Sequence, residues 1–203
     1  MAKRYWERVY ETKSAAEVSW FQAHPERSLG FIRRVRPARD APIIDIGGGA
    51  SALVDELLGE GFTDVTVLDI SGAALTVARA RLGGQAARVT WLEADVTRAP
   101  LPRHHYAVWH DRATFHFLTR PEDRGRYLEA VRHAVRPGGY VVVATFAPDE
   151  PDRCSGLEVA RYSPEDLHRT FGSAFTPVAS AEETHVTPSG TEQAFTYCFC
   201  RKV

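Results

Sequence analysis

Short apolar runs alternate with stretches of helical spacing along most of this chain, and no other sequence feature constrains its fold more. The apolar runs cover residues 41–46, 65–69, 89–93, 106–110 and 140–146, with helices expected after Ser51, after Ser71 and over 122–135. This alternation predicts a parallel, doubly wound sheet. Two further strands, 174–186 and 192–201, flank a turn containing Pro188 and Gly190 and predict a closing hairpin. We therefore expect an α/β fold with a mostly parallel, seven-stranded sheet and an antiparallel last strand.

The size and charge of the chain argue against several classes of protein. Its 203 residues correspond to a single domain, residues 1–203. The 25 Lys and Arg residues nearly balance the 26 Asp and Glu residues, so the overall charge gives no reason to expect nucleic acid or an anionic membrane as a partner. No segment approaches the roughly 20 apolar residues of a membrane span, and the polar start is not a secretory signal. Three cysteines, an odd number, argue against a disulfide framework, so we expect a cytoplasmic protein.

The first 40 residues differ in style from the rest of the chain and predict a cap laid over it. Helices are expected at roughly 3–12 and 25–36, and Pro37 closes the second. Basic residues outnumber acidic ones here, and aromatic residues gather at Tyr5-Trp6, Tyr10 and Trp20-Phe21. We interpret residues 1–40 as an N-terminal lid and residues 41–203 as the core of the domain.

A glycine-rich turn and two acidic residues predict a nucleoside-binding pocket. The turn 47–49 follows Asp45 at the end of the first strand, where glycines let the backbone approach a ligand and the next helix presents free N–H groups. Asp69 ends the second strand, where an acid typically accepts hydrogen bonds from ribose hydroxyls. Asp95 follows the third strand, where it can accept one from an adenine amino group. Each acid alone could merely cap a helix, but the turn and both acids together describe an adenosine-shaped pocket.

Two cofactor families use such a pocket. The spacing Gly47-x-Gly49-x-x-Ala52 fits the dinucleotide fingerprint, but 203 residues leave little room for a separate substrate domain. The spacing Asp45-x-Gly47-x-Gly49 fits a second pattern, and here residues 41–203 resemble the class I S-adenosylmethionine-dependent methyltransferases. The motifs that carry the resemblance are IIDIGGGAS (43–51), VLDIS (67–71), LEADV (92–96), WHD (109–111) and RPGGYVV (136–142).

This resemblance implies a Rossmann-like methyltransferase fold with S-adenosyl-L-methionine as cofactor. Asp45 would organise the groups around the methionine ammonium, Asp69 would bind the ribose and Asp95 the adenine amino group. Ile70 and Val96 would enclose the adenine ring. The full set expected to bind the cofactor is Asp45, Gly47, Gly48, Gly49, Asp69, Ile70, Ser71, Asp95, Val96, His110 and Trp20.

The loop expected after the fourth strand is where this family places the methyl group. Methyl transfer from a sulfonium is an in-line displacement, so the protein mainly aligns the acceptor, and a base helps where the acceptor must lose a proton. Asp111 is the first candidate for a catalytic or positioning residue, and His110 or His116 is a candidate base. Both histidines could instead be packed polar residues that support the loop. Arg112 could bind an acidic acceptor or pair with Asp111.

Two further resemblances disagree about the acceptor. The stretch Asp111-Arg112-Ala-x-Phe-His resembles the loop of small-molecule thiol and thiopurine methyltransferases. The opening YWERVY (5–10) with Trp20-Phe21 resembles the methyltransferases that modify lysines of elongation factor 1A and citrate synthase. In both groups the N-terminal segment closes over the cofactor. The expected substrate-binding residues are Trp20, Phe21, Arg112, Phe146 and Cys154, the last as a loop thiol for a soft substrate or as an incidental cysteine.

The leading hypothesis is a methyltransferase with a small-molecule acceptor, such as a thiol or a related soft nucleophile. The alternatives are a protein-lysine N-methyltransferase, an NAD-dependent oxidoreductase and a non-catalytic module that binds an adenosyl ligand. Cys198 and Cys200 alternate along the last strand, and no paired His or Cys completes a set of four ligands. We therefore expect them in the core and predict no metal site.

Overall fold

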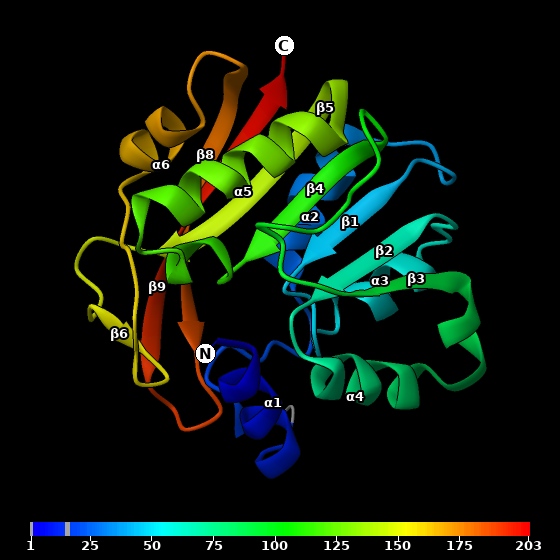
Figure 1. Ribbon diagram of the computed structural model, residues 1–203, viewed down its shortest axis with the longest axis vertical. Coiled ribbons are helices and arrows are strands. Elements are labelled where there is room, and N and C mark those ends of the chain that lie inside the picture. The colour runs from blue at the N-terminus through cyan, green and yellow to red at the C-terminus, as the bar shows by residue number, and fades with distance from the viewer. Residues whose placement is uncertain (1, 15–16) are drawn as a thin grey trace.

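The computed structural model describes residues 2–14 and 17–203, whose strands form a seven-stranded sheet with helices on both faces (Figure 1). Its strands lie in the order β3-β2-β1-β4-β5-β9-β8. The first five are parallel, and β9 pairs antiparallel with both β5 and β8. The strand bounds are β1 Ile43–Ile46, β2 Val65–Asp69, β3 Val89–Glu93, β4 Tyr106–Arg112, β5 Val135–Phe146, β8 Phe175–Val186 and β9 Glu192–Lys202. The predicted fold class is confirmed, with β9 as the reversed strand.

Helices cover both faces of the sheet, except for α1, which lies at one end of it. They are α1 Ala2–Thr12, α2 Glu26–Val35, α3 Leu53–Gly59, α4 Gly72–Leu82, α5 Pro121–Ala134 and α6 Pro164–Phe171. Apolar residues of α5 and α6 pack on one face, and those of α2, α3 and α4 pack on the other. The central strands β1 and β2 are therefore buried along their whole length, which is why they read as continuous apolar runs.

Local signals in the sequence explain where several helices begin. Ser71 precedes α4, and its Oγ accepts a hydrogen bond from the Ala74 N–H at 3.1 Å. Ser163 caps α6 in the same way, through the Asp166 N–H. Pro121 starts α5, where its missing N–H costs nothing.

The fourth strand is longer than the sequence predicts. It continues past His110 through Asp111 and Arg112, because β1 pairs with it as far as Asp111 and β5 as far as Arg112. The expected catalytic loop is therefore strand up to Arg112, and Ala113, with φ 69°, ends it. The structure also contains short elements that were not predicted. They are the 3-10 helices η2 Gly83–Arg88 and η3 Phe115–Phe117 and the two-residue strands β6 Arg153–Cys154 and β7 Leu157–Glu158.

The fifth strand also starts earlier than predicted. It includes Pro137, Gly138 and Gly139, which precede the expected strand 140–146. A register shift between Tyr106 and Val108 on the neighbouring strand accommodates this stretch.

The two helices of the first 40 residues lie in different places, α2 on one face of the sheet and α1 at its end. Leu29 and Ile32 of α2 are fully buried in the core layer beside α3. By contrast, α1 lies next to α4, at the end of the sheet where β1, β2 and β4 terminate (Figure 1). Among the described residues, none of the helices combines the length and apolar character needed to cross a bilayer.

Candidate functional site

A cavity of about 600 Å³ lies at the carboxyl ends of the parallel strands, beneath α1. Ligands of open α/β sheets bind at this edge, and the volume is typical of a small-molecule site. The lining residues are Trp6, Tyr10, Trp20, Gly47, Leu68, Asp69, Ile70, Ala94, Asp95, Val96, Thr97, Arg98, Arg112, Ala113, Thr114, Phe117, Leu118, Arg120, Asp123 and Arg126. Of the predicted cofactor residues, Gly47, Asp69, Ile70, Asp95, Val96 and Trp20 are among them.

The glycine turn fits tightly between two other parts of the site. Gly47 has φ +63°, and a Cβ at this position would overlap the Thr114 hydroxyl. Gly49 has φ +37°, and a Cβ there would lie 2.7 Å from Oδ2 of Asp69. Both positions therefore require glycine for conformation and for space.

Asp69 lies at the end of β2 and lines the cavity. Its Oδ1 accepts the Ser71 N–H at 2.8 Å. Burial raises the pKa of this carboxyl to about 7, and the nearby charges of Asp45 and Glu7 add to the effect. Because Asp69 lines the cavity, a ligand there could donate hydrogen bonds to its carboxylate.

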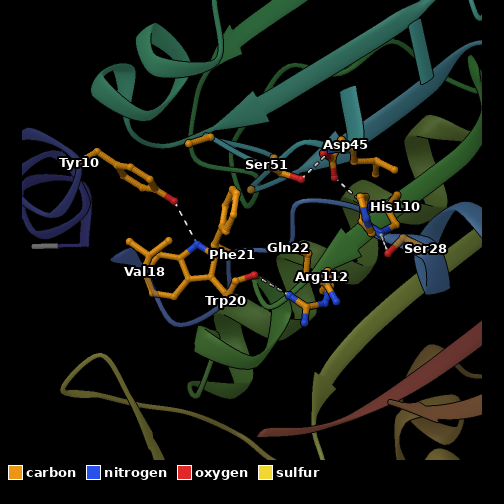
Figure 2. A pocket seen from close by; sticks show the side chains of 15 residues that line it. Tyr10, Val18, Trp20, Phe21, Gln22, Ser28, Asp45, Ser51, His110 and Arg112 are labelled. Atoms are coloured by element: carbon orange, nitrogen blue, oxygen red, sulfur yellow. Dashed lines mark hydrogen bonds and ion pairs between the residues drawn. The ribbon is translucent and has the colours of Figure 1, made fainter. Parts of the chain in front are cut away.

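A smaller cavity of about 40 Å³ adjoins the first, and Tyr10, Trp20, Gly47 and Arg112 line both. Figure 2 shows a line of hydrogen bonds on one side of it. His110 contacts Asp45 Oδ1 at 2.7 Å through Nδ1 and Ser28 Oγ at 2.8 Å through Nε2. His110 is nearly fully buried, so it acts here as a support for Asp45.

The second carboxylate oxygen of Asp45 is an unused acceptor. Oδ2 is buried, and none of the described residues gives it a hydrogen bond. A buried oxygen without a partner costs roughly 1–3 kcal/mol. An amine of a ligand in this cavity could donate a hydrogen bond to Oδ2, so the carboxylate of Asp45 suits an ammonium group.

Aromatic side chains of the N-terminal segment line the cavity on the side of α1. Trp6 makes edge contacts with Trp20 and Phe117, at ring-centroid distances of 5.5 and 5.0 Å. The Trp20 indole N–H donates to the Tyr10 hydroxyl at 3.2 Å, as Figure 2 shows. Burial raises the pKa of Tyr10, so its hydroxyl stays protonated. Phe21, predicted to bind substrate, lines the smaller cavity.

Glu7 fixes α1 to the N-terminus of α4. Its two carboxylate oxygens accept the N–H groups of Gly72 and Ala73, each at 2.9 Å, and the Ser71 hydroxyl at 3.2 Å. The hydrogen bond from Ala73 is the main cause that lowers the pKa of Glu7. Ser71, which we predicted to bind cofactor, is thus a helix cap and a docking point for α1.

Arg112 faces the cavities but does not pair with Asp111. Its guanidinium donates to the Trp20 carbonyl at 3.0 Å and to Tyr197 Oη at 3.2 Å, and it pairs with Glu183 at 3.4 Å. Asp111 is on the adjacent strand position and therefore points to the opposite face. Of the two alternatives for Arg112, pairing with Asp111 is therefore wrong.

Asp111 lines neither cavity and is fully buried. Its Oδ1 accepts the N–H groups of Thr114 and Phe115, at 2.9 and 3.2 Å, and its Oδ2 accepts the Tyr127 hydroxyl at 2.7 Å. Burial raises the pKa of Asp111 to about 6. Asp111 therefore lies near the end of β4, where its carboxylate holds the following turn and does not face the cavity.

His116 is also fully buried away from both cavities. Burial and the charge of Arg112 lower its pKa to about 3. A histidine with this pKa is a poor proton acceptor near neutral pH.

Phe146 and Cys154 are buried and line neither cavity, because β5 and β6 turn them into the core. Burial raises the pKa of the Cys154 thiol. His116, Phe146 and Cys154 therefore do not reach either cavity.

Several residues that line the cavity were not among the predicted site residues. Trp6 and Tyr10 are four positions apart on α1, a spacing that places both on one face of a helix, and this signal was available. Arg98, Arg120 and Arg126 line the cavity without any motif that would reveal them. Together the lining groups suit a ligand with a planar ring, hydroxyl groups and an amine.

Comparisons with known proteins agree with this geometry. A family model described as a methyltransferase domain matches residues 43–139. The eEF1A lysine and N-terminal methyltransferase of Mus musculus is 22% identical over 149 residues, which is 70% of this chain. The chain spans 21% of the length of that mouse protein.

Two solved structures share the fold over the whole chain. One, reported for the conversion of a disulfide bond into a thioacetal group during echinomycin biosynthesis, has a TM-score of 0.79 at 16% identity, and 92% of it is covered. The other is 1,6-didemethyltoxoflavin-N1-methyltransferase of Burkholderia thailandensis with bound S-adenosylhomocysteine. It has a TM-score of 0.74 at 18% identity, and 87% of it is covered.

Proposed function

The chain belongs to the class I S-adenosylmethionine-dependent methyltransferases, and we propose that it methylates a small-molecule acceptor whose nucleophile is a thiol or a related soft atom. The cofactor of this family is S-adenosylmethionine, which supplies an electrophilic methyl group when bound. The proposal also places the protein in the cytoplasm, in keeping with its three free cysteines.

The cavity residues divide the binding of this cofactor between them. Asp69 is suited to accept hydrogen bonds from ribose hydroxyls, and Asp95 to accept one from the adenine amino group. Ile70 and Val96 offer apolar walls for the ring. The unused oxygen of Asp45 is suited to the methionine ammonium, with His110 holding the carboxylate in place.

The observation that carries the acceptor proposal is that no described residue lining the larger cavity is free to act as a base. Among the described residues, the proton-accepting side chains that line the larger cavity are Tyr10, Asp69, Asp95 and Asp123. Two of them are assigned to adenosine, Asp123 pairs with Arg126 at 3.2 Å, and the pKa of Tyr10 is raised. An acceptor that ionises in solution, as a thiol of low pKa does, needs no base from the protein.

The size and charge of the cavity favour a small acceptor over a protein lysine. The cavity lined by Trp6, Trp20 and Phe117 has a volume of about 600 Å³, which cofactor and acceptor would share. Arg98 and Arg120 are exposed at its edge and would repel a lysine-rich surface. Methylation of protein lysine, the activity named for the mouse relative, is the second outcome that the experiment distinguishes.

The test is a survey of acceptors with the purified protein and S-adenosylmethionine labelled in its methyl group. The panel contains aromatic and aliphatic thiols, amines, carboxylates and lysine-containing peptides, and the readout is labelled product. We expect turnover with thiols at a rate that follows the fraction of thiolate. Transfer to lysine peptides alone, with none to thiols, would overturn the acceptor proposal.

A binding control tests the cofactor site separately. Asp69→Ala should weaken S-adenosylhomocysteine binding by about 1.5–3 kcal/mol, the usual range for hydrogen bonds to a charged group. Asp149→Ala, an exposed carboxylate outside both cavities, should leave that affinity unchanged. Calorimetric titration measures both.

A further inference from the structure

We propose that His168, Cys198 and Cys200 form a binding site for one thiophilic metal ion of the Zn²⁺ class. His168 is on α6, and the two cysteines are on β9. The three potential ligand atoms all lie within 4.8 Å of one another. None of these residues lines either cavity, so the site is separate from the methyltransferase site and independent of its acceptor.

The geometry of β9 and α6 brings the three ligands together. Cys198 and Cys200 are two positions apart on a strand, which turns both side chains to the same face. That face carries α6, whose His168 Nδ1 lies 3.3 Å from Cys200 Sγ. The two sulfur atoms lie 2.9 Å apart, within hydrogen-bonding distance of each other.

The donor set is one that proteins use for zinc. Two thiolates and one imidazole make a Cys₂His site, and a solvent molecule completes four-coordination where the site opens to water. His168 is half-buried and gives that access, whereas the cysteines are 3% and 1% exposed. The sequence alone offered only a Cys-x-Cys pair, since His168 lies far away along the chain.

Charge explains why an ion suits this position better than free thiols do. Cys198 and Cys200 lie in an apolar cluster, where a thiolate without a partner of opposite charge would be costly. A divalent cation with two thiolates is neutral as a unit, which removes the cost of a buried net charge. The bound ion would link α6 to β9 and stabilise the C-terminal part of the sheet.

The experiment uses the full chain, reduced and stripped of metal by a chelator, and Zn²⁺ as the probe. We expect one Zn²⁺ per chain by metal analysis and calorimetry, and a higher melting temperature with zinc. Co²⁺ in place of Zn²⁺ should give sulfur-to-cobalt charge-transfer absorption. Cys200→Ser should weaken zinc binding by at least about 100-fold, since even the loss of an outer partner costs 10–100-fold.

Matched variants separate a metal site from a packing role. Cys154→Ser removes a buried thiol elsewhere and should bind Zn²⁺ like the parent protein. His168→Gln changes a half-buried position that should tolerate it and should also weaken zinc binding. Its circular dichroism and S-adenosylhomocysteine affinity should remain those of the parent.

Two results would overturn the proposal. One is a reduced, folded protein that takes up no Zn²⁺ at micromolar concentrations, or whose His168→Gln and Cys200→Ser variants bind as the parent does. The other is a protein whose measured mass is two hydrogens below that of the reduced chain, recovers these hydrogens on thiol reduction, and still binds no metal once it is reduced. That result would show that Cys198 and Cys200 form a disulfide instead.

Discussion

Replacing Asp111 should destabilise the fold rather than slow the chemistry. Three buried or partly buried donors end on this carboxylate: the N–H groups of Thr114 and Phe115 and the hydroxyl of Tyr127. Asp111→Ala leaves all three without an acceptor. At about 1–3 kcal/mol for each, less the relief of removing a buried charge, we expect a loss of about 3–6 kcal/mol. That is a large fraction of the roughly 5–15 kcal/mol that keeps a domain folded.

Asp111→Asn provides the sharper comparison. Its amide oxygen still accepts both N–H groups, but its NH₂ cannot accept the Tyr127 hydroxyl, so we expect a loss of about 1–2 kcal/mol. The pH dependence has a definite sign. Because the folded-state pKa is raised to about 6, Asp111 contributes most stability below its ordinary value of 3.8, and that contribution declines up to pH 6. The cost of Asp111→Asn should therefore shrink from pH 4 to pH 6.

Urea unfolding followed by tryptophan fluorescence measures these differences, with the slope against urea checked for two-state behaviour. Calorimetry on the folded variants should give S-adenosylhomocysteine affinities close to the parent value. An Asp111→Asn protein with parental stability and a kcat lowered about 100-fold would refute the reasoning and return Asp111 to the reacting groups.

Three further changes test the cofactor side of the site. Because burial raises the pKa of Asp69 to about 7, S-adenosylhomocysteine affinity should rise between pH 6 and 8 as the carboxylate forms, and Asp69→Asn should flatten this rise in calorimetric titrations. Glu7→Gln should speed hydrogen exchange in α1 by weakening its hold on α4 by about 1 kcal/mol, while the exposed Glu11→Gln should not; equal exchange in both would argue against the docking role. Gly47→Ala should weaken cofactor binding by about 1–2 kcal/mol or more, since φ +63° strains any other residue; unchanged affinity by titration would contradict this.

The position of the larger cavity could be predicted from the sequence because its signals are local. A strand followed by the turn 47–49 fixes where a ligand meets the backbone, and Asp69 and Asp95 each follow a strand of the same parallel sheet. Parallel strands end at one edge, so residues at their ends converge without any knowledge of the packing. Trp20 lines the cavity, as predicted from the aromatic clusters and from the resemblance to families whose N-terminal segment closes over the cofactor.

The roles of His110, Asp111 and His116 depended on the tertiary structure. Pairing with β1 and β5 extends β4 through Arg112, and successive residues of a strand then point to opposite faces. His110 therefore meets Ser28 of α2, whereas Asp111 meets Tyr127 of α5. A sequence shows that three titratable residues lie close together along the chain, but only the helices packed on each face decide which of them is sealed in the core and which reaches a cavity. The same holds for His168, which α6 brings to two cysteines that look unremarkable on their own strand.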